Sequence, residues 1–183
     1  LNIDKSKQRY RQLPRLLRER IHYEPRRRQD IDFVFMAAFP RQARLIPPQL
    51  RFFHAADVPV YTTSHSFTGN KDASADRDMD GVIIGDMPWI LSANSVQAVR
   101  DDVFRYWPER AHQFGRLYAL GVDAYNVLYY LNWMRTNPQA RLRGATGGLY
   151  MDETNEIHRQ MTWAKFDGGI PKPLAANPVA QDR

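Results

Sequence analysis

The stretch DIDFVFMAAFPRQARLIPPQLRFFHAADVPVYTTSHSF, residues 30–67, decides the fold. It opens with an almost unbroken apolar run, residues 31–38, which is typical of a strand covered on both faces in a parallel sheet. A helical pattern begins at Pro40, and Pro47 and Pro48 within it predict a kink or a break. A second run of β-branched and aromatic residues, VPVYTT, follows directly. The stretch therefore predicts a strand, a helix and a parallel strand, which is the right-handed unit of an α/β domain.

Three further segments extend this unit. GVIIG, residues 81–85, predicts a third strand. Apolar residues at helical spacing predict a long helix over residues 109–134, in which Gly115 and Gly121 indicate contacts too close for a Cβ. Alternating apolar residues on either side of an acidic turn predict a β-hairpin within residues 144–166.

These patterns divide the chain into four parts. We expect a basic helical lead-in, an α/β lobe with three parallel strands, a part in which helices and the hairpin return to a second lobe, and a loose tail. Their boundaries are residues 1–29, 30–93, 94–170 and 171–183.

Composition bounds the class of protein. A chain of 183 residues that is 43% hydrophobic and 25% charged suits one domain or one lobe of a larger one. The longest apolar run has seven residues, 33–39, so no segment is expected to span a membrane. Residue 1 is Leu and no hydrophobic signal core follows it, so we expect any targeting segment to lie outside these residues. The absence of cysteine excludes disulfides, cysteine-ligated zinc and thiol nucleophiles.

The net charge of +6 is concentrated at one end of the chain. Residues 1–28 hold ten Lys or Arg against three acidic residues, whereas the remaining 155 residues hold 16 against 17. An amphipathic helix there is expected to pack its leucine side on the domain, and a contact with an acidic partner or anionic lipid is the alternative. Because the rest of the chain is slightly acidic, we expect no nucleic-acid partner.

One location in the predicted sheet suits a ligand. Ligands of parallel α/β sheets bind beyond the carboxyl ends of the strands. The candidate ligand residues are Ser64, His65, Ser66, Asp86 and Trp89. The competing interpretation is that Trp89 belongs to the core and that the polar residues cap helices.

Other reactive patterns are incomplete. Asp76, Asp78 and Asp80 with Gly81 reproduce the first half of a calcium loop, but Met87 stands where a bidentate carboxylate is needed. The glycine-rich GATGG follows a helix and opens a hairpin, so it is not expected to cradle a phosphate. We therefore predict no metal, no cofactor and no catalytic residue.

Four motifs resemble one known family. They occur in order from about Glu24 to Pro171, and together they identify the chain as similar to the LppC/LpoA family of outer-membrane lipoproteins. The motifs are PRRRQDIDF (25–33), DGVIIGDMPW (80–89), RLYALGVDAY (116–125) and GATGGLYMDETNEIHRQMTWAKF (144–166).

The resemblance implies a fold, a function and a location. The fold would be of the type I periplasmic-binding-protein kind, with two α/β lobes, the first part of which these residues lack. The function would be non-catalytic: to bind and activate a bifunctional class A penicillin-binding protein, the synthase that polymerises and cross-links peptidoglycan. The location would be the periplasmic side of the outer membrane of a Gram-negative bacterium, through a lipid anchor outside these residues.

A second function class stays open at this stage. Most proteins with that fold bind or sense a solute in the cleft between the lobes, so a periplasmic solute-binding or sensing module is the alternative. Peptidoglycan or a small polar solute would then be a further ligand. No residue is assigned to the contact with the synthase.

Overall fold

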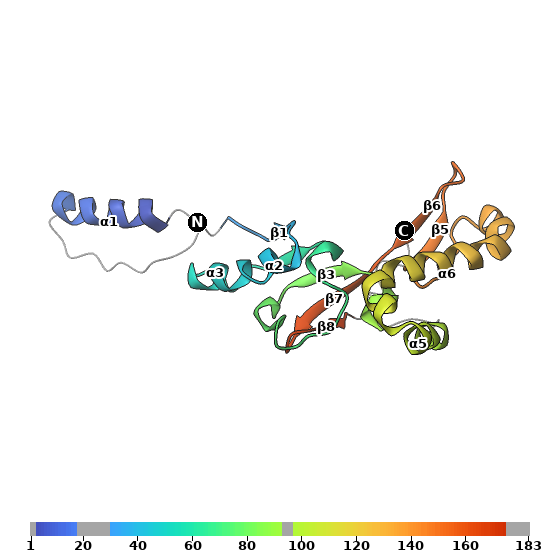
Figure 1. The fold of residues 1–183 in the computed structure, drawn as a ribbon. Helices are drawn as coiled ribbons and strands as arrows, with labels where there is room; N and C mark the ends of the chain where they lie inside the picture. The colour runs from blue at the N-terminus through green and yellow to red at the C-terminus, as the bar shows by residue number, and fades with distance from the viewer. Residues whose placement is uncertain (1–2, 18–29, 93–96, 175–183) are drawn as a thin grey trace.

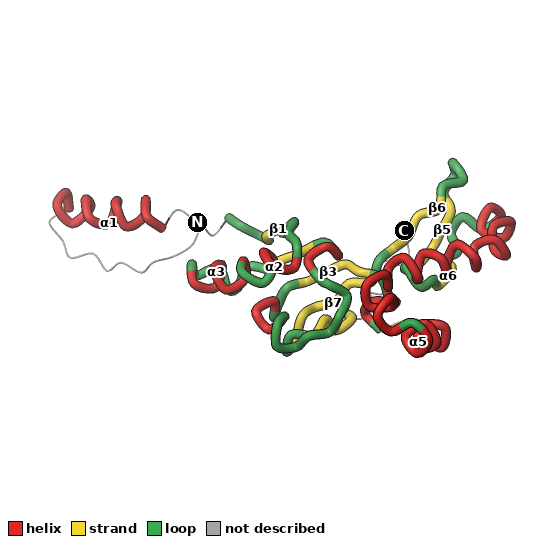
Figure 2. The backbone as a smooth tube through the Cα atoms, in the orientation of Figure 1, coloured by secondary structure: helices red, strands yellow, loops and turns green. Residues whose placement is uncertain are grey.

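The computed structural model describes residues 3–17, 30–92 and 97–174, which form two β-sheets and the helices around them (Figures 1 and 2). The PRRRQ part of the basic lead-in and most of the predicted tail lie outside the described residues. The elements are α1 (Ile3–Leu17), β1 (Val34–Met36), α2 (Pro40–Ala43), α3 (Ile46–Phe52), β2 (Val60–Thr62), η1 (Ser64–Ser66), η2 (Arg77–Met79), β3 (Ile83–Asp86), α4 (Pro88–Leu91), α5 (Gln97–Tyr106), α6 (Pro108–Thr136), β4 (Leu142–Arg143), β5 (Gly148–Met151), β6 (Ile157–Gln160), β7 (Thr162–Asp167) and β8 (Ile170–Pro173).

The larger sheet has the strand order β1-β2-β3-β7-β8. Its first three strands are parallel, with Val34 opposite Val60 and Tyr61 opposite Ile83. This confirms the parallel α/β sheet predicted from the apolar runs. β7 and β8 extend the sheet in antiparallel fashion.

One face of this sheet carries the main core. Ala43 from α2 is fully buried, and Ile46 and Leu50 from α3 pack against the same cluster as Met36 and Ile84 from the strands. These apolar contacts hold α2 and α3 on the sheet, because burying apolar surface is the main favourable term in folding.

The helix predicted between the first two strands is broken. α2 ends at Ala43 and α3 begins at Ile46. Pro47 and Pro48 lie in the first turn of α3, where a missing N–H breaks no helical hydrogen bond. The break expected from the two prolines is therefore confirmed.

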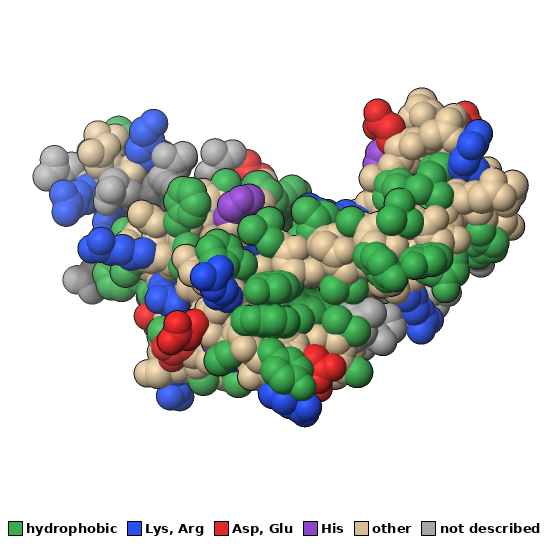
Figure 3. All heavy atoms as spheres, turned by 45° about the vertical axis from the view of Figure 1, so that its right-hand side comes forward, with side chains coloured by type: hydrophobic (Ala, Val, Ile, Leu, Met, Phe, Trp, Pro, Cys, Tyr) green, Lys and Arg blue, Asp and Glu red, His purple; other side chains and the backbone are tan. Residues whose placement is uncertain are grey.

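The opposite face of the sheet is open, so the prediction of a first strand covered on both faces is wrong. Phe33 and Phe35 are 58% and 62% exposed. Phe33, Tyr61 and Trp163 form a row of edge-to-face ring contacts across the strands. Figure 3 shows hydrophobic side chains gathered at the surface over the middle of the molecule. An apolar run in the sequence thus reveals a strand but not how many of its faces are covered.

The second sheet, β4-β5-β6, packs against the carboxyl-terminal half of α6. Val127 and Met134 of α6 form a small separate core with Leu149 and Met151 of β5. The predicted hairpin is confirmed as β5 and β6, which pair from Gly148–Gln160 to Met151–Ile157. α6 runs from the larger sheet to this smaller one (Figure 1).

The chain changes sheets after the hairpin. β7 pairs with β3 in the larger sheet, so Trp163, which lies within the predicted hairpin segment 144–166, is not part of the β5–β6 hairpin. The predicted tail also begins too early, because Ile170–Pro173 forms β8 and Pro171 is buried.

α1 stands apart from both sheets (Figure 1). Its side chains Leu13 and Leu16 are 42% and 78% exposed. Leu13, on the side of this helix that was predicted to pack on the domain, is therefore not covered, and Ile21 on the same side lies outside the described residues. No helix within the described residues is long and apolar enough to cross a membrane.

Candidate functional site

The guanidinium of Arg116, from α6, lies at the carboxyl ends of β2 and β3, where the sequence predicted a ligand. Its Nη2 donates to Asp86 Oδ2 at 2.6 Å and to the backbone oxygens of Ser64 at 3.1 Å and Phe67 at 3.2 Å. Its Nε donates to Asp86 Oδ1 at 3.3 Å. The structure thus brings two predicted site residues together around a side chain that sequence reasoning missed.

Burial explains why Asp86 needs this partner. Asp86 is 0% exposed, whereas the Arg116 side chain is 32% exposed. The backbone N–H of Met87 also donates to Asp86 Oδ1, at 2.7 Å. A buried carboxylate without a partner is strongly destabilising, so the ion pair is a structural requirement of the strand end.

The other predicted ligand residues lie elsewhere. Trp89 is fully buried in α4, and its indole Nε1 has no hydrogen-bond partner among the described residues. Ser66 is buried and its hydroxyl donates to the Thr63 carbonyl at 2.9 Å. His65 is exposed and its ring lies edge-to-face with Phe39. These placements agree with the interpretation that the residues serve core packing and turn formation. Ligand binding by them stays a prediction.

The two glycines of α6 differ in their surroundings. A Cβ at Gly115 would lie 3.3 Å from the Ile90 side chain, which confirms the close contact predicted there. A Cβ at Gly121 would have nothing within 4 Å, so the same prediction is wrong for that position. Gly115 therefore lets α6 approach α4 and carry Arg116 to the strand ends.

The GATGG loop binds a carboxylate of the protein itself. Asp123 of α6 is 4% exposed and accepts hydrogen bonds from the N–H groups of Ala145 at 2.6 Å and Thr146 at 2.7 Å. The Thr146 hydroxyl donates to it as well, at 2.6 Å. A Cβ at Gly144 would lie 2.5 Å from Asp123 Oδ2, which explains the glycine.

Arg116 and Asp123 are seven residues apart and so lie on one side of α6, two turns from each other. They are the two charged residues in the middle of α6, between Arg110 and Arg135, and their opposite charges at this spacing are a sequence signal for both.

The carboxylates of Asp76 and Asp80, in the loop that resembles half a calcium site, bond to different parts of the protein. Asp76 is buried, and its Oδ1 pairs with Arg44 Nε at 2.8 Å; within the part of the chain that the structure describes, Asp76 Oδ2 has no hydrogen-bond partner. Asp80 accepts the Gly169 N–H at 2.7 Å. These two carboxylates therefore tie the loop to α2 and to the turn between β7 and β8.

A groove of about 690 Å³ lies along α5 and α6, away from the predicted ligand residues. Its lining is mostly apolar and includes Val99, Phe114 and Leu117. The sequence pattern did not indicate it, because a groove between two helices depends on how they pack against each other.

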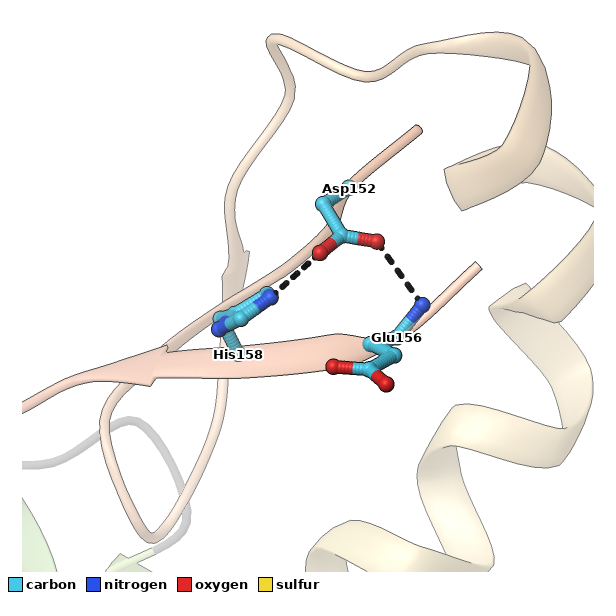
Figure 4. Close-up of side chains that lie close together, drawn as sticks. All are labelled: Asp152, Glu156 and His158. Atoms are coloured by element: carbon cyan, nitrogen blue, oxygen red, sulfur yellow. Dashed lines mark hydrogen bonds and ion pairs between the residues drawn. The ribbon is translucent and has the colours of Figure 1, made fainter. Parts of the chain in front are cut away.

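Three side chains of possible metal-ligand type meet at the tip of the β5–β6 hairpin: Asp152, Glu156 and His158 (Figure 4). His158 Nε2 lies 2.6 Å from Asp152 Oδ2. Asp152 Oδ1 also accepts hydrogen bonds from the Thr154 hydroxyl and from the N–H groups of Thr154 and Glu156. The Asp152 carboxylate therefore organises the hairpin turn.

These contacts predict a pH response of the turn. Hydrogen bonds from the Thr154 hydroxyl, from His158 and from the Glu156 backbone hold the pKa of Asp152 well below its usual value of 3.8. Because the folded-state pKa is depressed, the stabilisation is present above pH 3.8 and is lost as the pH falls through the lower folded-state value. We expect the Asp152 carboxyl carbon resonance to stay that of the ionised form down to about pH 4. A midpoint at or above the usual value in an NMR titration would contradict this assignment.

Comparison with known proteins places the chain in a family. The family model described as "LppC putative lipoprotein" matches residues 1–169. The chain belongs to the LppC family. The resemblance drawn from the four sequence motifs is thereby confirmed.

An LppC relative from Vibrio vulnificus (strain YJ016), named penicillin-binding protein activator LpoA, is 30% identical over 164 residues. The alignment covers 88% of this chain and 26% of the relative, so the chain spans about a quarter of the length of the curated relatives it matches.

Two solved structures have a fold similar to that of this chain. The LpoA (YraM) C-domain from Haemophilus influenzae, described as a regulator of PBP1A, aligns with a TM-score of 0.66 at 23% identity and covers 90% of this chain and 49% of that one. A putative branched-chain amino acid ABC transporter protein from Chromobacterium violaceum aligns with a TM-score of 0.53 at 26% identity, over 87% and 54%. The predicted periplasmic-binding-protein-like fold is confirmed.

Proposed function

We propose that this LppC chain is part of a non-catalytic regulator that binds and activates a bifunctional class A penicillin-binding protein. The match to the LppC family over residues 1–169, with relatives named as activators of a penicillin-binding protein, carries the proposal. The regulator would act from the periplasmic side of the outer membrane, where a lipid anchor outside these 183 residues would hold it.

At the strand ends the buried Asp86 carboxylate is paired within the protein, which leaves it without a free oxygen for a solute to bind in this state. The Asp86 carboxylate and the backbone oxygen of Ser64 are bonded to Arg116. Asp123 is similarly bonded to its own loop. The solute-binding alternative keeps only the fold in its favour, and fold is a weak guide to function.

Adding the intact protein to its class A synthase is expected to raise the rate of glycan polymerisation, of cross-linking, or of both. An activator shifts the population of the synthase by binding its active state more tightly. The rates are measured separately with a lipid-linked precursor as the protein concentration is increased to saturation.

A monofunctional glycosyltransferase without the regions specific to the class A synthase is the control, and its rate should not change. Unchanged rates of both reactions across the concentration series would overturn the proposal.

A further inference from the structure

The acceptors at the carboxyl ends of β2 and β3 form a site for a nitrogen cation. They are the carboxylate of Asp86 and the backbone oxygens of Ser64 and Phe67, all between 2.6 and 3.3 Å from nitrogen atoms of Arg116. Carboxylate and carbonyl oxygens accept hydrogen bonds and do not donate them. A guanidinium or an ammonium suits these acceptors, because it carries several N–H donors and a positive charge that compensates the buried carboxylate.

This site lies where a ligand would bind and not where a surface ion pair would form. It lies where parallel α/β sheets bind ligands, beyond the carboxyl ends of adjacent strands. Asp86 is completely buried, so its charge must be compensated at all times. The Arg116 side chain that fills the subsite is about one-third exposed, so its removal is expected to open a path from solvent to the subsite.

We propose that Arg116 is a resident ligand: it occupies the cation subsite at the strand ends and excludes solutes that carry an ammonium or guanidinium group. This goes beyond the proposed function, since activation of a synthase does not require that the subsite at the strand ends be occupied. Asp123, two turns along the same helix, plays the corresponding role with a negative charge: its carboxylate accepts hydrogen bonds from the N–H groups of the GATGG loop. α6 thus supplies both a cation and an anion to polar sites that the loops and strand ends form.

The test is to remove the resident ligand and supply a free one. Ethylguanidinium, which matches the end of the arginine side chain, is added at millimolar concentration to the full chain while thermal unfolding is followed. The wild-type melting temperature should not rise, because the subsite is filled. Arg116→Ala should melt at a lower temperature than the wild type, and ethylguanidinium should raise that temperature by roughly 2–4 °C in a saturable way, since the ligand binds only the folded state.

Arg135→Ala is the matched control. Arg135 lies in the last turn of α6 and is exposed, so its removal should create no response to ethylguanidinium. Sodium chloride at equal ionic strength and urea at equal concentration separate specific binding from screening and from denaturant effects.

A second variant keeps the test decisive if Arg116→Ala does not fold. Arg116→Gln combined with Asp86→Asn removes both charges, so this double variant should fold and show no response to ethylguanidinium. A saturable rise in the wild-type melting temperature with ethylguanidinium or L-arginine, an unresponsive folded Arg116→Ala, or a responsive double variant would each overturn the proposal. None of these outcomes bears on activation of the synthase, which is measured separately.

Discussion

Asp123→Ala is expected to lower the free energy of unfolding by about 3–5 kcal/mol. The Asp123 carboxylate accepts bonds from the Ala145 N–H, the Thr146 N–H and the Thr146 hydroxyl, and all three residues are buried. Its removal leaves three buried donors without a partner, and each such donor costs about 1–3 kcal/mol. Urea unfolding followed by circular dichroism measures the change, provided that the m-value is the same in both proteins.

Asp152→Ala is the matched control for this prediction. Asp152 also accepts N–H groups of a loop, those of Thr154 and Glu156, but it does so at the exposed tip of the β5–β6 hairpin. Water can replace the lost carboxylate there, so the variant should lose much less stability than Asp123→Ala. Similar losses in the two variants, or a change below about 1 kcal/mol in Asp123→Ala, would contradict the role assigned to the buried loop.

The sequence was sufficient for those parts of the fold that depend on neighbouring residues. The apolar runs of β1, β2 and β3 predicted a parallel sheet, and Pro47 and Pro48 predicted the break between α2 and α3. Each of these signals is local, because a strand needs a run of apolar residues and a proline constrains only its own turn. The β5–β6 hairpin was predicted for the same reason.

What depends on distant residues could not be predicted. Arg116 meets Asp86 across 30 positions of the chain, and no spacing rule joins a strand end to a helix that far away. The exposure of Phe33 and Phe35 depends on whether another layer covers that face, which the residues of the strand do not encode. The sequence therefore indicated the strand ends as a polar location but not Arg116, and ligand binding there stays a prediction.

Arg116 and Asp123 each hold α6 to one of the two sheets. Arg116 fixes one part of the helix to the strand ends of the larger sheet, and Asp123 fixes the next part to the loop that leads into β5. Apolar packing alone is tolerant of small shifts, whereas charge-assisted hydrogen bonds at 2.6 Å require a single position. We therefore expect α6 to be the least mobile link between the two cores.

Gly169→Ala is expected to destabilise the protein by roughly 3–5 kcal/mol. Asp167 pairs with Ile170, so Gly168 and Gly169 form a two-residue turn between β7 and β8, and both have positive φ, +63° and +74°. Two such residues are the requirement of a type I′ hairpin, and the Gly-Gly pair was a signal for it that the sequence reasoning did not use. A Cβ at Gly169 would lie 2.2 Å from the Ala73 carbonyl oxygen, which is backbone and cannot rotate away.

Gly168→Ala isolates the cause of that loss, because the neighbouring glycine has the same type of backbone conformation but free space. A Cβ at Gly168 would have nothing within 4 Å, so this variant should lose only the roughly 1–2 kcal/mol that a left-handed conformation costs a residue with a side chain. Gly169→Ala must in addition push the turn away from residue 73 and weaken the bond from the Gly169 N–H to Asp80. Equal losses from the two alanines in urea unfolding would show that the turn does not press against the loop. A larger loss at Gly169 would mean that the 66–80 loop is held in place by the β7–β8 turn, and through it by the edge of the larger sheet.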